Sequence, residues 1–120
     1  MTSQKQIIGR AGEDYAAKLI TEAGLIIIKR NYRCPKGEID IIARDQEDLV
    51  FIEVRTRSSA VKGWGEESIT ALKRKRLQAV ASYFLLEQGY LTWPGIRFDL
   101  VAIRRQNGKL LCNWLKAIFQ

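Results

Sequence analysis

Two acidic residues on neighbouring predicted strands could hold a metal ion between them. Asp40 and Glu53 lie in apolar segments that are separated by a short polar stretch, Asp45 to Asp48, which has the character of a hairpin loop. If that loop has four residues, Asp40 lies directly opposite Glu53, with the two Cβ atoms about 5 Å apart. Carboxylates at this separation repel each other, and Mg²⁺ or Mn²⁺ would relieve the repulsion because hard cations prefer oxygen ligands. The alternative is that both side chains are solvated, and a loop longer or shorter by one residue would break the pairing.

Charged side chains from other segments could join this pair. Side chains two apart on a strand share a face, so Arg55 points to the same side as Glu53. Glu13 lies on the apolar, small-residue face of a predicted helix, where a charge needs a partner once the helix packs, and it could supply a third metal ligand. A charged residue at the edge of the helix contact is the alternative for Glu13. The hairpin register leaves the opposite face of the sheet to four apolar residues: Ile39, Ile41, Ile52 and Val54.

A second predicted helix carries a lysine at one end of its apolar stripe. The spacing of Lys73, Leu77, Val80 and Phe84 is that of a helix surface facing a sheet, so Lys73 could reach past the core toward the carboxylates. Lys73 also begins a run of four basic residues, which suits contacts to phosphate groups but is equally the pattern of a solvated face. The candidate contacts to nucleic acid are Arg57, Lys73, Arg74, Lys75 and Arg76.

The composition narrows the chemistry that is open to the chain. Its 120 residues include 20 Lys and Arg against 13 Asp and Glu, for a net charge of +7, and they include no histidine. A domain this basic attracts polyanions, of which nucleic acid is the commonest, although the charge could serve solubility alone. Without histidine, Ser-His-Asp and Cys-His catalysis and His-ligated zinc are excluded. Catalysis would depend on carboxylates, basic side chains, hydroxyls or a bound hard cation.

The cysteines and the apolar segments bear on where the protein acts. Cys34 and Cys112 cannot complete a structural zinc site by themselves, and two cysteines in a well-cored chain are expected to be reduced thiols. The N-terminal segment lacks the apolar run of a signal peptide. The longest uncharged apolar stretch, Ala79 to Leu86, is too short to span a bilayer. We therefore expect a cytoplasmic protein without a membrane partner.

The periodicity predicts an α/β protein, with residues 1–120 forming one domain. Three consecutive strands predict an antiparallel meander, and the helix before the fourth strand predicts a parallel crossover, with two long helices flanking a mixed sheet that ends in a C-terminal β-hairpin. A sheet edge in that hairpin could support a homodimer. Gly9 and Gly12 within the first helix indicate either that another element approaches its first half closely or that the helix begins after residue 4. Trp64 lies in a predicted loop, 57–65, as a cover for the core or a stacking residue for a base. The predicted helices are 4–23 and 67–88, and the predicted strands are 25–32, 38–44, 49–56, 96–105 and 109–119.

Taken together, these motifs resemble the signature of the YraN-type bacterial proteins. The resemblance rests on the segments Gly37 to Asp40 and Val50 to Arg57, and it extends to Glu13, to Lys73 and to the Arg97-Phe98-Asp99 segment. That family is similar in organisation to archaeal Holliday junction resolvases of the restriction-endonuclease-like superfamily. The resemblance implies an αβββαβ core and a Mg²⁺ or Mn²⁺ site of the PD-(D/E)xK kind. It implies Glu13, Asp40 and Glu53 as metal ligands in a nuclease that cleaves DNA, with branched DNA as one candidate substrate.

One position departs from the family pattern. Lysine is usual where this chain has Arg55, and it is thought to orient or activate the attacking water. Arginine keeps the positive charge but does not lose its proton near neutral pH, so it cannot act as a base, and Lys73 could take over part of that role. A nucleic-acid-binding protein that keeps the nuclease fold without full activity is the alternative, and a protein-interaction scaffold is a second one. Asp99 could orient a basic site residue, but a structural salt bridge is the favoured interpretation.

Overall fold

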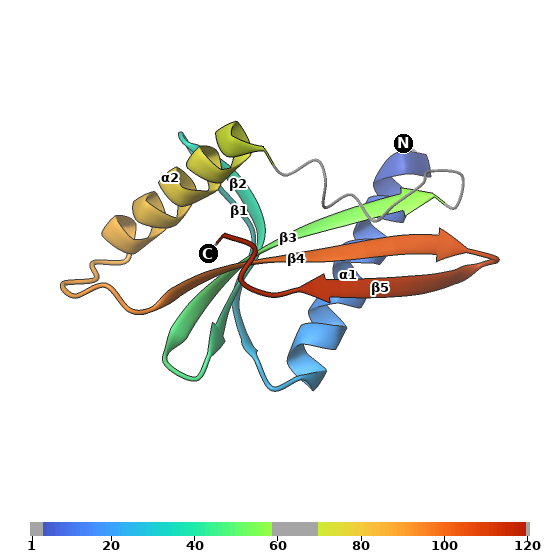
Figure 1. The fold of residues 1–120 in the computed structure, drawn as a ribbon, viewed down its shortest axis with the longest axis horizontal. Coiled ribbons are helices and arrows are strands. Elements are labelled where there is room, and N and C mark those ends of the chain that lie inside the picture. The colour runs from blue at the N-terminus through green and yellow to red at the C-terminus, as the bar shows by residue number, and fades with distance from the viewer. Residues whose placement is uncertain (1–3, 59–69, 120) are drawn as a thin grey trace.

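A computed structural model describes residues 4–58 and 70–119 of the chain. Its five strands form one mixed sheet in the order β1-β2-β3-β4-β5, in which β3 and β4 are parallel and the other pairs are antiparallel. The predicted α/β class, the meander and the parallel crossover are therefore confirmed (Figure 1). The elements are α1 (Gln4–Glu22), β1 (Ile26–Cys34), β2 (Gly37–Asp45), β3 (Asp48–Ser58), α2 (Ala71–Glu87), β4 (Ile96–Gln106) and β5 (Lys109–Leu115).

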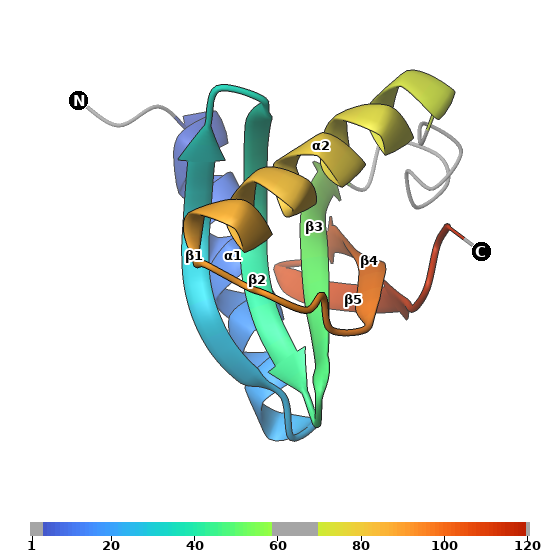
Figure 2. The same ribbon diagram turned by 90° about the vertical axis from the view of Figure 1, so that its left-hand side faces the viewer.

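The two helices pack on opposite faces of the sheet, as Figure 2 shows. The predicted stripe of α2 is buried: Leu77, Val80 and Phe84 pack against Ile42 and Phe51 of the sheet. Each helix thus closes one hydrophobic cluster, and burial of these apolar side chains is the main force that fixes helix and sheet together. The cluster under α1 contains Ala16, Ile20, Ile41, Val50, Ile52, Val101 and Ile103. None of the helices in the described part of the chain is long and apolar enough to cross a membrane.

The hairpin between β2 and β3 has the predicted register and a shorter loop. Ile42 pairs with Phe51, and Ile41 pairs with Ile52. Asp45 and Asp48 also pair, so the loop consists of two residues and not four. Gln46 adopts the left-handed φ of 57° that tight two-residue turns require. Because the loop is shortened equally on both strands, every residue keeps its predicted partner as far as Ile41 and Ile52.

Beyond that point the predicted pairing of Asp40 with Glu53 is wrong. The described pairing of β2 with β3 starts at Ile41, and the Val54 N–H donates a hydrogen bond of 2.7 Å to Asp40 Oδ2. Ile39 packs in the cluster under α2, whereas Ile41, two residues later, packs in the cluster under α1. The strand therefore changes face around Asp40, and its carboxylate replaces a backbone carbonyl as the acceptor from β3. The prediction that Ile39 shares a face with Ile41 is wrong for the same reason.

One of the two helix glycines is the site of a close approach. A Cβ atom at Gly12 would collide with the side-chain hydroxyl of Thr56 on β3, whereas a Cβ at Gly9 would meet no atom of the described residues within 4 Å. The prediction of close packing in the first half of this helix is therefore confirmed at Gly12. The contact sets the distance between α1 and β3, and Glu13 is the next residue.

These two glycines make a matched pair for measurement. We expect Gly12→Ala to lower the free energy of unfolding by about 1–3 kcal/mol, because the new methyl group overpacks the α1–β3 contact. Gly9→Ala should raise it by about 0.5–1 kcal/mol, because alanine is the better helix former where there is room. Urea unfolding of both variants is the measurement. Equal stabilisation by the two substitutions would contradict the proposed role of Gly12.

Several predicted boundaries differ from the structure. Helix α2 begins at Ala71 and not near residue 67, because Thr70 is extended (φ −98°, ψ 167°) and caps the helix by accepting from the Lys73 N–H. Strand β3 continues through Ser58, and the remainder of the predicted loop, including Trp64, lies outside the described residues. Strand β5 ends at Leu115 and not at residue 119.

Asp99 explains why the chain leaves the sheet after Leu115. Its buried carboxylate accepts hydrogen bonds from Arg97 Nε and Nη2, from Trp114 Nε1 and from the backbone N–H of Ala117. The last of these bonds turns the chain at Ala117, which has a φ of 53°, and the next residue, Ile118, donates to the Phe98 carbonyl. The prediction of a structural salt bridge at Asp99 is confirmed.

Candidate metal centre

The Asp40 carboxyl group joins three elements of the fold. It accepts from the Val54 N–H of β3 and shares a side-chain hydrogen bond with Glu13 of α1. The pKa of Asp40 is raised to about 7, chiefly by burial. The hydrogen bond with Glu13 and the charges of Glu13 and Glu53 act in the same direction, while the Val54 N–H opposes them. A hydrogen bond between two carboxyl groups needs a proton on one of them, which agrees with the raised pKa of Asp40.

Glu53 is held by cations on the same side of the sheet. Lys73 Nζ forms an ion pair with Glu53 Oε1, and Arg55 Nη2 lies 3.8 Å from Glu53 Oε2. The Glu53 side chain is only 15% exposed. Its Oε2 atom is buried and has no hydrogen-bond partner among the described residues. Such an oxygen is costly in a folded protein, and its presence indicates a site that is completed by something else.

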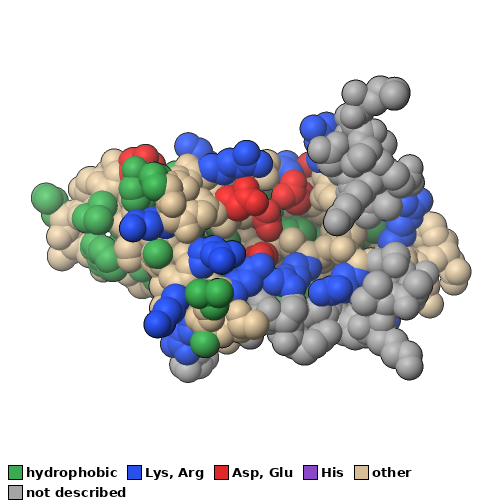
Figure 3. Space-filling model, turned by 90° about the horizontal axis from the view of Figure 1, so that it is seen from above, with side chains coloured by type: hydrophobic (Ala, Val, Ile, Leu, Met, Phe, Trp, Pro, Cys, Tyr) green, Lys and Arg blue, Asp and Glu red, His purple; other side chains and the backbone are tan. Residues whose placement is uncertain are grey.

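Figure 3 shows acidic side chains gathered in the middle of one face of the molecule, with lysine and arginine side chains on both sides. The predictions that Glu13 partners the other acids and that Lys73 reaches them are thus confirmed as contacts. The hydrogen bond between Asp40 and Glu13 and the ion pair of Lys73 with Glu53 each reduce the repulsion among these carboxylates.

The carboxylate side chains at this site have the ligand atoms that a hard divalent cation prefers, but they are not positioned around a single ion. Within residues 4–58 and 70–119, no three acidic, cysteine or histidine side chains already form a group that could hold an ion. Every available donor is nevertheless a carboxylate oxygen, as Mg²⁺ and Mn²⁺ prefer. Glu53 Oε2 has no hydrogen-bond partner among the described residues, and the raised pKa of Asp40 favours a proton that a cation could displace. Glu13, Asp40 and Glu53 are therefore the residues that would hold the metal.

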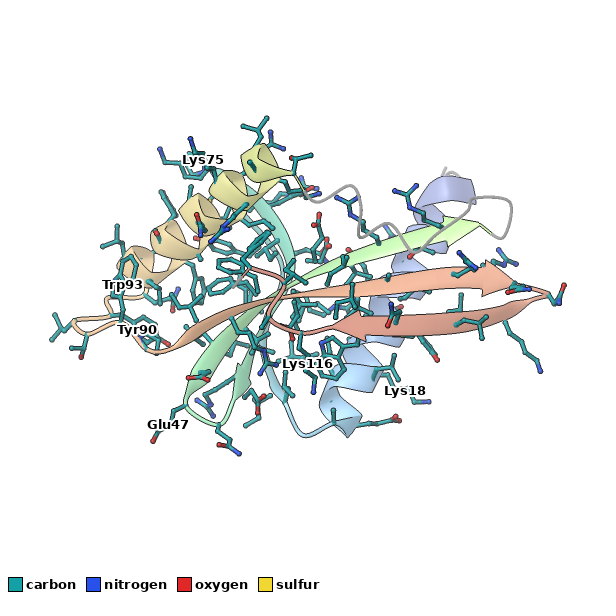
Figure 4. The ribbon with its side chains drawn as sticks, in the orientation of Figure 1. Lys18, Glu47, Lys75, Tyr90, Trp93 and Lys116 are labelled. Carbon is teal, nitrogen blue, oxygen red and sulfur yellow. The ribbon has the colours of Figure 1, made fainter. Side chains whose placement is uncertain are left out.

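The predicted basic run is divided by the geometry of the helix. Consecutive residues of an α-helix point in directions about 100° apart. Lys73 points to Glu53, whereas Arg74 lies over the ring of Phe119, 5.3 Å from its centroid. Arg76 lies against Gly37 at the turn between β1 and β2. Lys75 points away from the sheet on the outer side of α2 (Figure 4). The structure therefore brings Lys73 and Arg74 to the carboxylate side of the molecule and leaves Lys75 away from it.

Two further basic residues on this side were not predicted. Arg104 of β4 pairs with Arg57 of β3 in the parallel ladder, and such neighbours point to the same face of a sheet. Arg57, Arg55 and Glu53 alternate along β3 and share that face. Lys116 follows the end of β5 and lines a cavity together with Arg74. Sequence patterns did not reveal Arg104 because its position depends on the register between β3 and β4. That register is set by the crossover connection and cannot be read from local periodicity.

Comparison with known proteins agrees with the sequence motifs. Residues 12–103 match the model of the uncharacterised protein family UPF0102. A UPF0102 protein of Desulfitobacterium hafniense is 55% identical over 107 residues, which cover 89% of this chain and 88% of the relative. A UPF0102 protein of Moorella thermoacetica is 48% identical over 103 residues, covering 86% of this chain and 85% of the relative. The chain therefore belongs to the uncharacterised protein family UPF0102, the YraN family that its motifs resemble.

Proposed function

We propose that this protein is a metal-dependent nuclease that cleaves phosphodiester bonds in DNA. The observation that carries the proposal is the interaction of Asp40 with the carboxylates of Glu13 and Glu53, together with a buried oxygen of Glu53 that has no hydrogen-bond partner among the described residues. Structural ion pairs seldom leave a carboxylate oxygen buried and unsatisfied, whereas metal sites of nucleases need such oxygens. The five-stranded mixed sheet between two helices is consistent with a restriction-endonuclease-like core.

Each charged residue has a task in this proposal. Glu13, Asp40 and Glu53 would hold Mg²⁺ or Mn²⁺, which when bound lowers the pKa of a water molecule and polarises a phosphoryl oxygen. Lys73 and Arg55 lie on either side of the Glu53 carboxylate and would stabilise the negative charge that develops on the phosphate. Arg55 serves only as a fixed positive charge, because a guanidinium keeps its proton at any relevant pH.

The charge of the molecule supports a nucleic acid as the partner. The net charge is +7, and basic side chains flank the carboxylates on both sides in Figure 3. Contacts between such side chains and phosphates supply affinity without reading sequence. DNA would then be chosen by its shape, and branched DNA is the structure-selective candidate.

A cleavage assay tests this proposal directly. Purified protein is incubated with four-way, flap, nicked and linear DNA in Mn²⁺, in Mg²⁺ and in EDTA. We expect cleavage with either metal, no cleavage in EDTA, and little dependence on base sequence. Failure to cut any of these substrates in Mn²⁺ would contradict a nuclease function.

Arg55 favours a second candidate, a DNA-binding protein with weak or no cleavage. We expect Arg55→Lys to increase the rate of Mn²⁺-dependent cleavage by about tenfold or more, because lysine can release a proton to activate water. DNA affinity should change by less than about twofold, since the charge is kept. The matched control is Arg33→Lys at a side chain that is 82% exposed and paired with Glu38. If wild type binds DNA without cutting and Arg55→Lys cuts, the second candidate is correct; if Arg55→Lys is slower than wild type, arginine is the active group.

A further inference from the structure

A cavity of about 580 Å³ opens beside the candidate metal centre. It lies between the first turn of α2, strands β4 and β5, and the segment that follows Leu115. Leu100, in its wall, is the neighbour of Glu53 in the parallel ladder between β3 and β4. Arg74, also in the wall, follows Lys73, which binds Glu53. A group bound in this cavity would therefore lie next to the carboxylates.

The cavity combines an apolar floor with two positive charges. Leu115, Ile118 and Phe119 contribute the apolar surface above the fully buried Leu100, and Arg74 and Lys116 contribute the charges. Arg74 stacks over Phe119, and Lys116 lies over the Trp114 ring with its Nζ 4.5 Å from the centroid. None of the described residues that line the cavity is acidic. The two positive charges favour an anionic ligand. The apolar floor favours an anion that also has a flat apolar part.

A nucleotide has both properties, because its phosphate is an anion and its base is flat and largely apolar on its faces. Phosphates of any DNA could meet Arg74 and Lys116, because both lie toward the surface. The apolar floor, in contrast, is accessible only to a base that has left the helical stack, and a paired base would first have to be flipped out at a cost of a few kcal/mol. Aromatic rings and arginine planes stack on unpaired bases of any sequence. The volume lies within the range of small-ligand sites, about 300–1,000 Å³.

We propose that this cavity binds an unpaired nucleotide of the DNA substrate, with its phosphate on Arg74 and Lys116 and its base on the floor that includes Phe119. The site selects DNA in which a single strand leaves a duplex, such as a flap, over continuous duplex. This inference rests on the proposed function for its substrate, and it places the junction between paired and unpaired DNA beside Glu53.

Binding measured without metal tests the cavity separately from cleavage. Fluorescence anisotropy in EDTA compares a flap DNA with a duplex of the same length, and 2-aminopurine at the first unpaired position reports on that base. We expect wild type to prefer the flap and to change the 2-aminopurine emission on binding. Phe119→Leu keeps an apolar side chain but removes the ring, and it should weaken flap binding by about fivefold or more while changing duplex binding by less than about twofold. The emission change should be lost with it.

Two further variants distinguish a specific loss of flap binding from a general folding defect. Arg74→Gln removes a surface charge that lies on the same ring, and it should also reduce the preference for the flap. Lys18→Ala, at an exposed position on α1, which packs on the face of the sheet opposite to α2 (Figure 2), should affect flap and duplex equally. The inference would be overturned if Phe119→Leu and Arg74→Gln weakened binding to flap and duplex equally, or if neither variant weakened binding to the flap. A flap preference in a protein that never cleaves would refute the nuclease proposal and leave the cavity assignment intact.

Discussion

Asp40→Asn should abolish metal-dependent cleavage and make the metal-free protein more stable at pH 8. An asparagine side chain can accept from the Val54 N–H and donate to Glu13, so both hydrogen bonds of Asp40 persist. The negative charge that a divalent cation requires is lost. Removal of an outer-shell partner typically costs metal sites about 10–100-fold, so loss of a ligand should cost cleavage more than about 100-fold.

The stability gain follows from the pKa of Asp40. The folded value is about 7, against an ordinary value of 3.8, because burial and the neighbouring acids disfavour the charged form. Between these values the folded protein holds a proton that the unfolded chain has released, so the free energy of unfolding falls as pH rises from about 4 to about 7. One pKa unit corresponds to about 1.4 kcal/mol, which makes about 4 kcal/mol the upper limit of the loss. Asp40→Asn removes this dependence and should equal wild type near pH 4 and exceed it at pH 8.

Urea unfolding in EDTA at several pH values, together with Mn²⁺ titration, measures both effects. Asp14→Asn is the matched control, because Asp14 is an exposed carboxylate on α1 that pairs with Arg30. That control should leave the pH dependence and the metal affinity as they are in wild type. An Asp40→Asn variant that keeps the wild-type pH slope would show that Asp40 does not cause that slope, and one that cleaves at the wild-type rate would show that Asp40 is not needed for the metal.

Lys73→Met should reduce cleavage by about 100-fold while metal binding is kept or strengthened. Lys73 is paired with Glu53, so its ammonium group competes with a cation for the Oε1 oxygen. Removing it frees that oxygen for the metal and at the same time removes a positive charge that would stabilise the transition state, a loss typically worth about 10²–10³ in rate. The variant should be less stable in EDTA, because Glu53 loses its closest partner, and Mn²⁺ should restore part of that stability.

Calorimetric Mn²⁺ titration, unfolding with and without Mn²⁺, and cleavage rates separate these effects. Lys75→Met is the control for metal affinity and stability, because it removes the same charge from the outer side of the same helix (Figure 4). If Lys73→Met weakened Mn²⁺ binding as much as Asp40→Asn does, Lys73 would support the metal site and would not compete for it. If it left cleavage unchanged, the charge on Lys73 would have no part in catalysis.

The sequence alone was sufficient wherever a residue's position depends on its near neighbours in the chain. The register from Arg44–Leu49 to Ile41–Ile52 follows from the hairpin, because adjacent strands joined by a short turn pair outward from that turn. The α2 stripe from Lys73 to Phe84 follows from the 3.6-residue period of a helix. Glu13, Asp40 and Glu53 could therefore be selected as candidates from residue type and spacing.

Tertiary structure decided the features that depend on segments far apart in the sequence. Asp40 does not pair with Glu53 as expected, because strand β2 changes face at Asp40. The alternation of apolar and polar residues along β2 does not predict this change. The placement of Arg104 beside Arg57 depends on the length of a crossover, and the turn after Leu115 depends on the buried carboxylate of Asp99. Local periodicity describes which way a side chain points along its own element. Packing between elements decides which carboxylate is protonated and which one contacts a lysine, because desolvation and charge act through space and not along the chain.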